Sequence, residues 1–483
     1  MIKEIALINP ESGWFSKGKH LPVNLNLGFL AIATSLHQHG FHVTLTDMLD
    51  LNFKETFVAL LKGTKIFIVS VDIQTVKIAL ELSREIKQAN SKAVIIWGSF
   101  NRGMFGKFIN LFPQLALEPD EVDFISFADS SLVNFIVSDL ADTTGMGYKQ
   151  GNKIIIDENT KLEPLMDVDY TLVDIEKNYF PRVGLEVSID KQFKRILPVF
   201  TGEGCPFSCT FCINSSPSAK RKFVLKDAEQ IISEIEFLKR KYNITHLWLQ
   251  DDNLFANKNR TFKLFDYLKR QPLYWAGQGR VEYFNNSYLT DEYFLSIAKN
   301  CCWFGVGYES YSDRLRKIFN KGRVTTERLL HVFQLCKKNN IVLAIAFIVG
   351  TIDETVEEMI ENVQFILKLK KEYPKFDITY QLYRPYPGTP EFQKIIERHD
   401  FQMPQSIYDY MIDNPYDDPV KHFVWLSDKE KLLVKYLGKM VAVAGSKDSM
   451  SFFKRPLAKL FYRVGLYRLR KRRFELFFER YVL

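Results

Sequence analysis

The chain has 483 residues, of which 46% are hydrophobic and 14% aromatic, and its formal net charge is +8. This composition excludes a disordered or fibrous protein, and the length predicts about three domain-sized units. Six cysteines in so long a chain do not form a disulfide framework and favour a cytoplasmic location. The start, MIKEIALINP, leads directly into a predicted strand rather than a signal peptide, and the longest apolar run, 341–349, is too short to span a bilayer.

Residues 1–142 alternate short apolar runs with helical patterns. The predicted strands include EIALIN, HVTLTDM, KIFIVSV, AVIIWGS and VDFISFA, and helices are predicted at 27–39, at 53–62 and from Thr75. This alternation is typical of a parallel, doubly wound α/β sheet, which binds ligands beyond the carboxyl ends of its strands. No GxGxxG follows the first strand, which disfavours a nicotinamide cofactor. The candidate ligand contacts at the strand ends are Ser70, Gly98 and Ala128.

Residues 143–190 are predicted to connect two domains, with KQGNKIIID as a hairpin that turns at Gly151 and Asn152. In 191–395 a second alternation of six strands and helices begins at ILPVFT and ends at DITYQLY. Six such units predict a partial (βα)6, TIM-like barrel with its chemistry at the carboxyl ends of the strands. Residues 396–483 are predicted to be mainly helical and to cap the barrel.

The loop after the first barrel strand contains GCPFSCTFC, which places Cys205, Cys209 and Cys212 in a CxxxCxxC spacing. Three thiolates in a short loop can ligate three irons of a [4Fe-4S] cluster and leave the fourth iron open for a small molecule. A zinc site would need a fourth Cys or His nearby, and the next candidate, His246, lies on a distant predicted strand. The spacing therefore favours an iron–sulfur cluster over zinc or over a loop with three chance cysteines.

The motif and its surroundings resemble the radical S-adenosylmethionine (SAM) superfamily, in particular the branch with a cobalamin-binding domain before the radical barrel. The resemblance also rests on LNLGFLAIATSLHQHGFHVTLTDM, WFGVGYES and YRPYPGTP, and it covers roughly residues 1–395. It implies a Rossmann-like cobalamin-binding domain at 1–142, a linker at 143–190, the radical SAM barrel at 191–395 and a helical region with a basic tail at 396–483. It further implies that the cluster binds SAM, which one electron cleaves to methionine and a 5′-deoxyadenosyl radical.

The resemblance also implies roles for residues around the cluster. Phe211 would lie against the adenine, and Gly350 would allow close backbone approach to it. A carboxylate after the second barrel strand would pair with the methionyl ammonium, and Arg280 would bind the methionyl carboxylate. The alternatives are a solvated turn for the carboxylates and a brace of the barrel rim for Arg280. The implied cofactor-binding side chains are Asp251, Asp252, Arg280 and Glu309, and the implied substrate contacts, or rigid rim residues, are Tyr383, Arg384 and Tyr386.

The turns of the first domain depart from the pattern of the branch. WGSFNRG and FADSS stand where relatives carry Gly-Gly-Pro-like and Arg-Gly-Glu-Gly-Glu-like turns. There is no Asp-x-His-x-x-Gly, so no histidine is offered as a lower axial cobalt ligand. The alternative to a cobalamin domain is therefore a domain that keeps the fold without the cofactor.

The resemblance predicts a cobalamin-dependent radical SAM enzyme that methylates an unactivated carbon of a small-molecule, lipid or peptide substrate. The alternative is a radical SAM enzyme that catalyses rearrangement, cyclisation or oxidation without methyl transfer. A transfer-RNA methylthiotransferase is disfavoured because the first domain lacks cysteines for a further cluster. The implied partner is an electron donor such as flavodoxin or ferredoxin.

The positive charge is concentrated in the tail, because residues 452–483 contain ten Lys or Arg and two Asp or Glu. No broad basic face is expected elsewhere, so no nucleic-acid partner is expected. A basic tail with interleaved aromatics can lie on anionic lipid as a peripheral membrane contact, bind an acidic substrate, or pack across the protein with its charges outward. The other cysteines, Cys301, Cys302 and Cys336, are predicted to be core residues.

Overall fold

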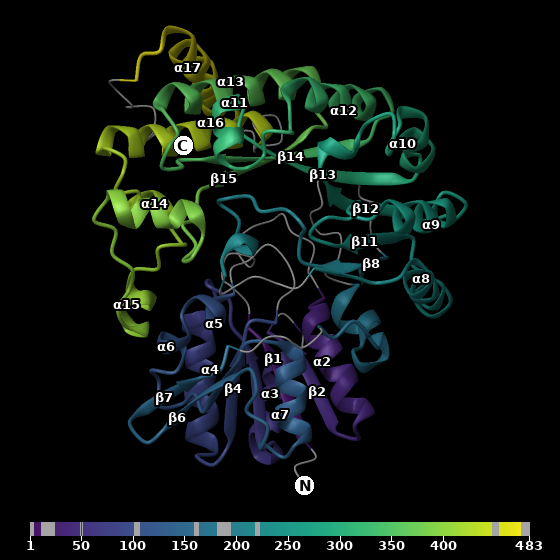
Figure 1. The fold of residues 1–483 in the computed structure, drawn as a ribbon, viewed down its shortest axis with the longest axis vertical. Helices are drawn as coiled ribbons and strands as arrows, with labels where there is room; N and C mark the ends of the chain where they lie inside the picture. The colour runs from purple at the N-terminus through teal and green to yellow at the C-terminus, as the bar shows by residue number, and fades with distance from the viewer. Residues whose placement is uncertain are drawn as a thin grey trace.

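The computed structural model describes residues 4–10, 25–48, 50, 52–100, 107–158, 164–180, 195–217, 223–446 and 454–474. Two sheets, each flanked by helices, form two domains that lie one above the other in Figure 1. C-terminal helices cover the second domain, and one of them reaches back to the first (Figure 1). The predicted architecture, a doubly wound domain followed by a partial barrel and a helical region, is confirmed.

The first sheet has seven strands in the order β2-β1-β3-β4-β5-β6-β7. Its five leading strands pair in parallel, because each is joined to the next by a helix that crosses the sheet. The strands are β1 (Glu4–Asn9), β2 (His42–Asp47), β3 (Ile66–Ser70), β4 (Val94–Gly98), β5 (Phe124–Ser126), β6 (Met146–Gln150) and β7 (Lys153–Ile156). The helices are α2 (Leu27–Gln38), α3 (Phe53–Gly63), α4 (Val76–Ala89), α5 (Phe108–Leu111), α6 (Pro113–Ala116) and α7 (Asp129–Val137).

The predicted hairpin is present, but it does not belong to a connector. Strands β6 and β7 turn at Gly151, and β6 pairs antiparallel with β5, so the hairpin extends the first sheet. An edge strand as short as β5 exposes unpaired backbone groups, and the hairpin satisfies them. The first structural unit therefore continues to about residue 156.

The second sheet has six parallel strands in the order β15-β14-β13-β12-β11-β8, which confirms the partial barrel. The strands are β8 (Ile196–Phe200), β11 (His246–Gln250), β12 (Tyr274–Gly279), β13 (Cys301–Glu309), β14 (Val342–Val349) and β15 (Asp377–Leu382), with a small ladder of β9 (Gly202–Glu203) and β10 (Val224–Leu225). The helices are α8 (Ala228–Tyr242), α9 (Lys258–Leu268), α10 (Asp291–Ala298), α11 (Asp313–Ile318), α12 (Thr326–Lys338) and α13 (Val356–Glu372).

The barrel helices show why the sequence pattern was informative. Helix α8 begins with a capping box of Asp227 and Gln230, and it buries Ile231, Ile235 and Leu238 at helical spacing against the sheet. Residues Cys301 and Cys336 are buried in the same core, and Cys302 is half-buried. Among the described residues, no helix is both long and apolar enough to cross a bilayer.

The C-terminal region has two roles, of which only one was predicted. Helices α16 and α17 pack against the barrel side as expected, whereas α15 docks on the first domain beside α5 and α6 (Figure 1). The Tyr410 hydroxyl donates to the backbone oxygen of Ile73 (2.7 Å), and the Ile407 amide donates to Glu118 (2.6 Å). These helices are α14 (Pro390–Arg398), α15 (Ile407–Ile412), α16 (Asp428–Ser446) and α17 (Arg455–Lys471). Short helical turns lie at Tyr170–Leu172, Ile175–Tyr179, Ile213–Ser215, Val281–Tyr283 and Pro419–His422.

We expect Tyr410→Ala to loosen the attachment of α15 to the first domain by about 3 kcal/mol, because a large buried aromatic and its hydrogen bond are lost. Limited proteolysis should then cut the segment around α15 faster than in the native protein. Tyr408 lies on the same helix and is 45% exposed, so Tyr408→Ala is the matched control and should leave the cutting rate unchanged. If the two variants were cut at equal rates, Tyr410 would not attach α15 to the first domain.

Candidate active site

The three motif cysteines lie in the loop after β8 and β9, beyond the carboxyl end of the first barrel strand. All three are free thiols and are at least partly buried. Burial raises the pKa of Cys205, and it raises the pKa of Cys212 to about 12. Cys205 and Cys212 therefore hold their protons in the metal-free protein, and iron binding must displace them.

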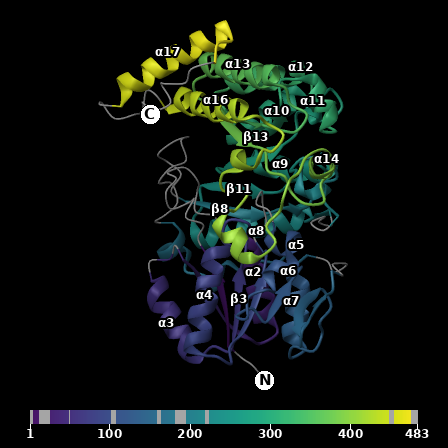
Figure 2. The same ribbon diagram turned by 90° about the vertical axis from the view of Figure 1, so that its left-hand side faces the viewer.

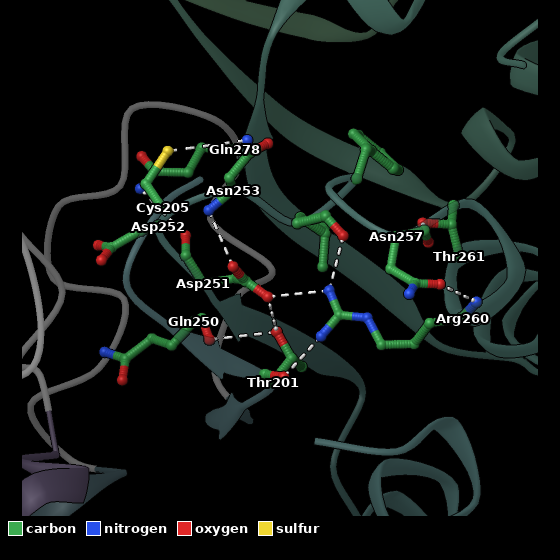
Figure 3. Close-up of polar contacts among 12 residues, drawn as sticks. Thr201, Cys205, Gln250, Asp251, Asp252, Asn253, Asn257, Arg260, Thr261 and Gln278 are labelled. Atoms are coloured by element: carbon green, nitrogen blue, oxygen red, sulfur yellow. Dashed lines mark hydrogen bonds and ion pairs between the residues drawn. The ribbon is translucent and has the colours of Figure 1, made fainter. Parts of the chain in front are cut away.

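Two polar side chains from neighbouring strand ends point at the cysteine sulfurs. The Asn253 amide nitrogen lies 3.8 Å from Cys205 Sγ (Figure 3), and Arg280 Nη1 lies 3.4 Å from Cys209 Sγ. Donors of this kind stabilise negative charge on sulfur, as thiolate ligands of an iron–sulfur cluster require. The chemistry of these donors fits a [4Fe-4S] cluster held by the three cysteines.

A single metal ion would make a different demand. Within the described ranges, no three His, Cys, Asp or Glu side chains are arranged to hold one ion. In a cubane cluster each thiolate binds a different iron, so the three sulfurs stand further apart than the ligands of one zinc ion do.

Arg280 is held by three groups at once. Its guanidinium pairs with Glu282 (Nη2 to Oε1 2.5 Å), lies 3.8 Å from the centre of the Phe207 ring, and reaches Cys209. It therefore braces the cysteine loop as well as lining the rim. Its implied role towards a methionyl carboxylate stays a prediction.

The two predicted carboxylates after β11 differ in position, as Figure 3 shows. Asp251 is buried and accepts hydrogen bonds from Arg260 Nη2 (3.0 Å), Thr201 Oγ1 (3.0 Å) and the backbone N–H of Asn253 (2.8 Å). Burial raises the pKa of Asp251, and the Arg260 guanidinium opposes that rise. Asp251 is therefore an internal brace that fixes Asn253, rather than part of a solvated turn.

Asp252 faces the cysteine loop instead. Its Oδ2 accepts from the Gly204 amide (3.0 Å) and from Asn214 Nδ2 (3.4 Å), on either side of the three cysteines in sequence. Of the two carboxylates, only Asp252 stands beside the cysteine loop, and its implied contact with the methionyl ammonium stays a prediction.

Glu309 ends β13 in a strained conformation, with φ at +70°, at a shift in the strand register. Its carboxylate pairs with Lys321, whose Nζ also donates to the backbone oxygen of Gly307 (3.0 Å). Both side chains are buried, so the charge is compensated. Glu309 is thus a member of a buried ion-pair network, and its implied contact with the cofactor stays a prediction.

Gly350 has the positive φ (+82°) that favours glycine, but the C-terminal region lies against it. A Cβ at this position would lie 2.4 Å from the Phe423 ring, and Trp425 Nε1 donates to the Gly350 oxygen (3.1 Å). The Gly350 amide donates to Glu354 (2.6 Å). The close approach that glycine permits here is made by Phe423, and the proposed approach to adenine stays a prediction.

The remaining predicted residues lie where the barrel meets other parts of the chain. Phe211 contacts Phe319 edge-on (5.3 Å between ring centroids). Tyr386 stacks on Tyr416 (5.6 Å between ring centroids), and Arg384 Nε lies 3.5 Å from the backbone oxygen of Tyr416. Tyr383 is buried, and its hydroxyl has no partner in the described part of the chain.

Tyr386 connects the cysteine loop with the first domain. Burial raises the pKa of Tyr386 to about 12; Arg384 opposes this rise, and Cys212 and Asp72 add to it. Since Asp72 lies just beyond the end of β3, the cysteine loop and the carboxyl edge of the first sheet face the same region.

The three candidate cobalamin contacts are brought together at that edge. Ser70 pairs with Gly98, which pairs with Ser126, and Ala128 immediately precedes α7. A Cβ on Gly98 would lie 2.0 Å from the Phe100 ring, so this ring covers Gly98. At this edge, the buried hydroxyls of Ser70, Ser130 and Ser131 have no hydrogen-bond partner in the described ranges.

Unsatisfied buried hydroxyls cost free energy unless a ligand or water pairs with them, so this edge fits a polar ligand such as the side chains of a corrin or its nucleotide tail. The Phe100 ring means that such a ligand would contact an aromatic face at Gly98 rather than bare backbone.

Comparison with known proteins agrees with this geometry. Residues 199–366 match the Radical SAM superfamily, and they span β8 to α13 with the three cysteines. The matched segment lies within the barrel, and this part of the chain is similar to the radical SAM superfamily.

Two curated relatives match longer parts of the chain at low sequence identity. An uncharacterized methyltransferase of Pyrococcus horikoshii is 29% identical over 259 residues, which are 52% of this chain and 51% of the relative. The anaerobic magnesium-protoporphyrin IX monomethyl ester cyclase of Rubrivivax gelatinosus is 24% identical over 65% of this chain and 56% of its own length. The chain thus spans about half the length of these relatives.

Among solved structures, the radical SAM methyltransferase TsrM of Kitasatospora setae superposes with a TM-score of 0.61 at 17% identity. The match covers 82% of this chain and 76% of TsrM, so both domains share the fold. TsrM has been solved with cobalamin and a [4Fe-4S] cluster bound.

Several site residues were not predicted. Phe207, Glu282, Arg260 and Lys321 fix the predicted groups by ring contact or ion pair. Phe207 could have been found, since it lies inside the cysteine motif, and Glu282 lies two residues after Arg280. Arg260 and Lys321 carry no sequence signal, because any exposed helix or turn supplies similar residues.

Glu354 should make stability depend on pH. Burial raises its pKa to about 8, so between about pH 5 and 8 the unfolded state is ionised while the folded state keeps the proton. The unfolding free energy of the native protein should therefore fall as pH rises through this window, by up to about 4 kcal/mol at pH 8. In Glu354→Gln this pH-dependent fall should be absent. Thermal midpoints at pH 5 and pH 8 measure it.

Glu358→Gln is the control for this experiment. Although burial opposes it, hydrogen bonds from Arg314 and Ser312 lower the pKa of Glu358 to about 2, so the group is ionised at both pH values. Its loss should cost the same at pH 5 and pH 8. If Glu354→Gln also shifted the midpoint equally at both, a protonated Glu354 would be ruled out.

Proposed function

We propose that this chain is a cobalamin-dependent radical SAM enzyme that methylates an unactivated carbon. The observation that carries the proposal is the cysteine loop of a radical SAM barrel with Asn253 and Arg280 directed at two of its sulfurs. The TsrM-like arrangement of two domains supports it, and so does the methyltransferase among the relatives.

The residues of the chain divide the work as follows. Cys205, Cys209 and Cys212 would hold a [4Fe-4S] cluster, which supplies the electron that cleaves SAM. Cobalamin at the carboxyl edge of the first sheet would supply the methyl carrier. Arg280 and Asn253 stabilise negative charge on sulfur and, being buried, help keep water from the loop.

Electrons would come from a small reductant such as flavodoxin or ferredoxin, since no second cysteine motif is present in the sequence. Free thiols throughout the chain favour a reducing compartment, and we therefore propose a cytoplasmic location.

The inner face of the barrel bears on the substrate. Trp248, Ala276 and Trp303 are in register on β11, β12 and β13, so they share this face, and the two indoles lie 5.2 Å apart. A Cβ on Gly305 would lie 2.6 Å from Trp303, so the indole lies flat across the strand. Ala344 is in register with Gly305.

Both tryptophans are only half-buried, and polar Gln278 on β12 and Thr379 on β15 lie nearer to the carboxyl ends of the strands. A flat aromatic and small-residue wall with polar edges suits a flat, largely apolar ring compound with polar substituents. The cyclase among the relatives is named for such a substrate, a magnesium-protoporphyrin ester, and we propose a substrate of this class.

The same relative favours a second candidate function. Its name describes ring formation, so a radical SAM reaction without methyl transfer, that is rearrangement, cyclisation or oxidation, is the alternative.

Product analysis distinguishes the two functions. Anaerobically reconstituted, reduced protein with SAM should form 5′-deoxyadenosine, and the variant with alanine at all three cysteines should form none and should lack the cluster's iron and brown absorbance. If the enzyme methylates its substrate, S-adenosylhomocysteine and 5′-deoxyadenosine should form in about equal amounts during turnover. Mass spectrometry measures both. Product and 5′-deoxyadenosine without S-adenosylhomocysteine would defeat the methylase proposal and favour the alternative.

We expect Trp303→Ala to weaken binding of protoporphyrin IX about tenfold, because a flat ring loses the indole it stacks on. Binding is measured by absorbance titration of the reconstituted protein with SAM present. Tyr274 is an exposed aromatic at the amino end of β12, so Tyr274→Ala is the control and should bind like the native protein. If Trp303→Ala bound protoporphyrin IX with native affinity, the aromatic wall would not be part of the substrate site. The proposed radical chemistry would not be affected by that result.

A further inference from the structure

Helix α17 packs firmly on the molecule through one face. Ala458, Phe461, Gly465 and Leu469 recur at helical spacing and are buried. At Gly465 an added Cβ would lie 2.0 Å from Met440 Sδ of α16, so the two helices are in close contact. The orientation of α17 is therefore fixed, and the sequence expectation that the tail packs across the protein holds for this face.

A second apolar stripe of α17 faces away from the protein. Leu457, Leu460 and Tyr467 also follow helical spacing, and they are 43%, 58% and 57% exposed. Half-buried Val464 lies between them. A helix that only covers the barrel needs one apolar face, so the second one is unexplained by packing.

The charge around the outward stripe has one sign. Residues 454–474 contain nine Lys or Arg and no Asp or Glu. Arg472 is paired with Glu357 of α13, and Arg463 and Arg470 are exposed on the outer side. Figure 2 shows α17 at the end of the molecule that is remote from the first domain, where a flat surface can approach it.

We propose that the outer face of α17 docks on an anionic lipid surface, with Leu457, Leu460 and Tyr467 entering the headgroup layer and the surrounding Lys and Arg contacting lipid phosphates. An acidic protein or nucleic acid would match the charge, but an apolar stripe flanked by cations is the pattern of helices that lie in a membrane interface. The docking does not depend on the proposed reaction.

The experiment is co-flotation of the full chain with vesicles of 30% phosphatidylserine in phosphatidylcholine, and with phosphatidylcholine alone. We expect binding to the anionic vesicles, and weaker binding at high salt. Leu460→Glu and Arg463→Glu should each lower the affinity at least about tenfold, since one blocks insertion and the other reverses a charge. Both side chains are exposed, so folding, checked by circular dichroism, should be unchanged.

The matched controls replace similar side chains elsewhere. Ile412, 85% exposed on α15, and Lys54, exposed on α3, are changed to Glu and should bind vesicles like the native protein. No binding of the native chain to anionic vesicles would overturn the proposal, as would full binding by Leu460→Glu. Binding of a short RNA that is lost in Arg463→Glu, without vesicle binding, would assign the helix to a nucleic acid instead.

Discussion

Burial of the cysteine loop between two domains is the constraint on which the rest of the site depends. A buried thiol resists ionisation, and the pKa of Cys212 rises to about 12 as a result. Hydrogen-bond donors make buried thiolates less costly, and here Asn253 is directed at Cys205 and Arg280 at Cys209. A buried guanidinium needs its own counterion, and Glu282 supplies it. The need to compensate charge at the buried cysteines thus accounts for Asn253, Arg280 and Glu282.

The carboxyl ends of the barrel strands carry three buried acids, and the cost of burying them is met in two different ways. Asp251 pairs with Arg260, and Glu309 pairs with Lys321. Glu354 has backbone donors but no cation among its hydrogen-bond partners in the described residues, and its pKa rises to about 8. The first two keep charge at the rim and the third stays neutral near pH 7, so residues of one chemical type are not equivalent as ligand contacts.

The features that could be predicted from the sequence are those that depend on a short, continuous segment of the chain. The cysteine spacing, the strand and helix periodicity, and the turn at Gly151 are local, and each was found where expected. Phe207 and Glu282 lie in or beside a predicted motif, but other partners were missed because they are distant in the sequence. Phe423 meets Gly350, and Tyr410 meets Ile73, across separations that no local pattern encodes. The hairpin was misplaced for the same reason, since only β5 decides which sheet it joins.

The placement of α17 bears on how an apolar substrate could reach the barrel. Helix α17 packs on α16, and α16 packs on α13 and on β15, the edge strand of the barrel sheet. A lipid surface held by α17 would therefore lie on the side of the open barrel edge rather than against the first domain (Figures 1 and 2). Flat apolar ring compounds partition into bilayers, because transfer of their surface from water is favourable. A membrane-docked barrel would then take its substrate from the bilayer, where its concentration is highest, and the aromatic wall would replace the lipid contacts that the ring gives up.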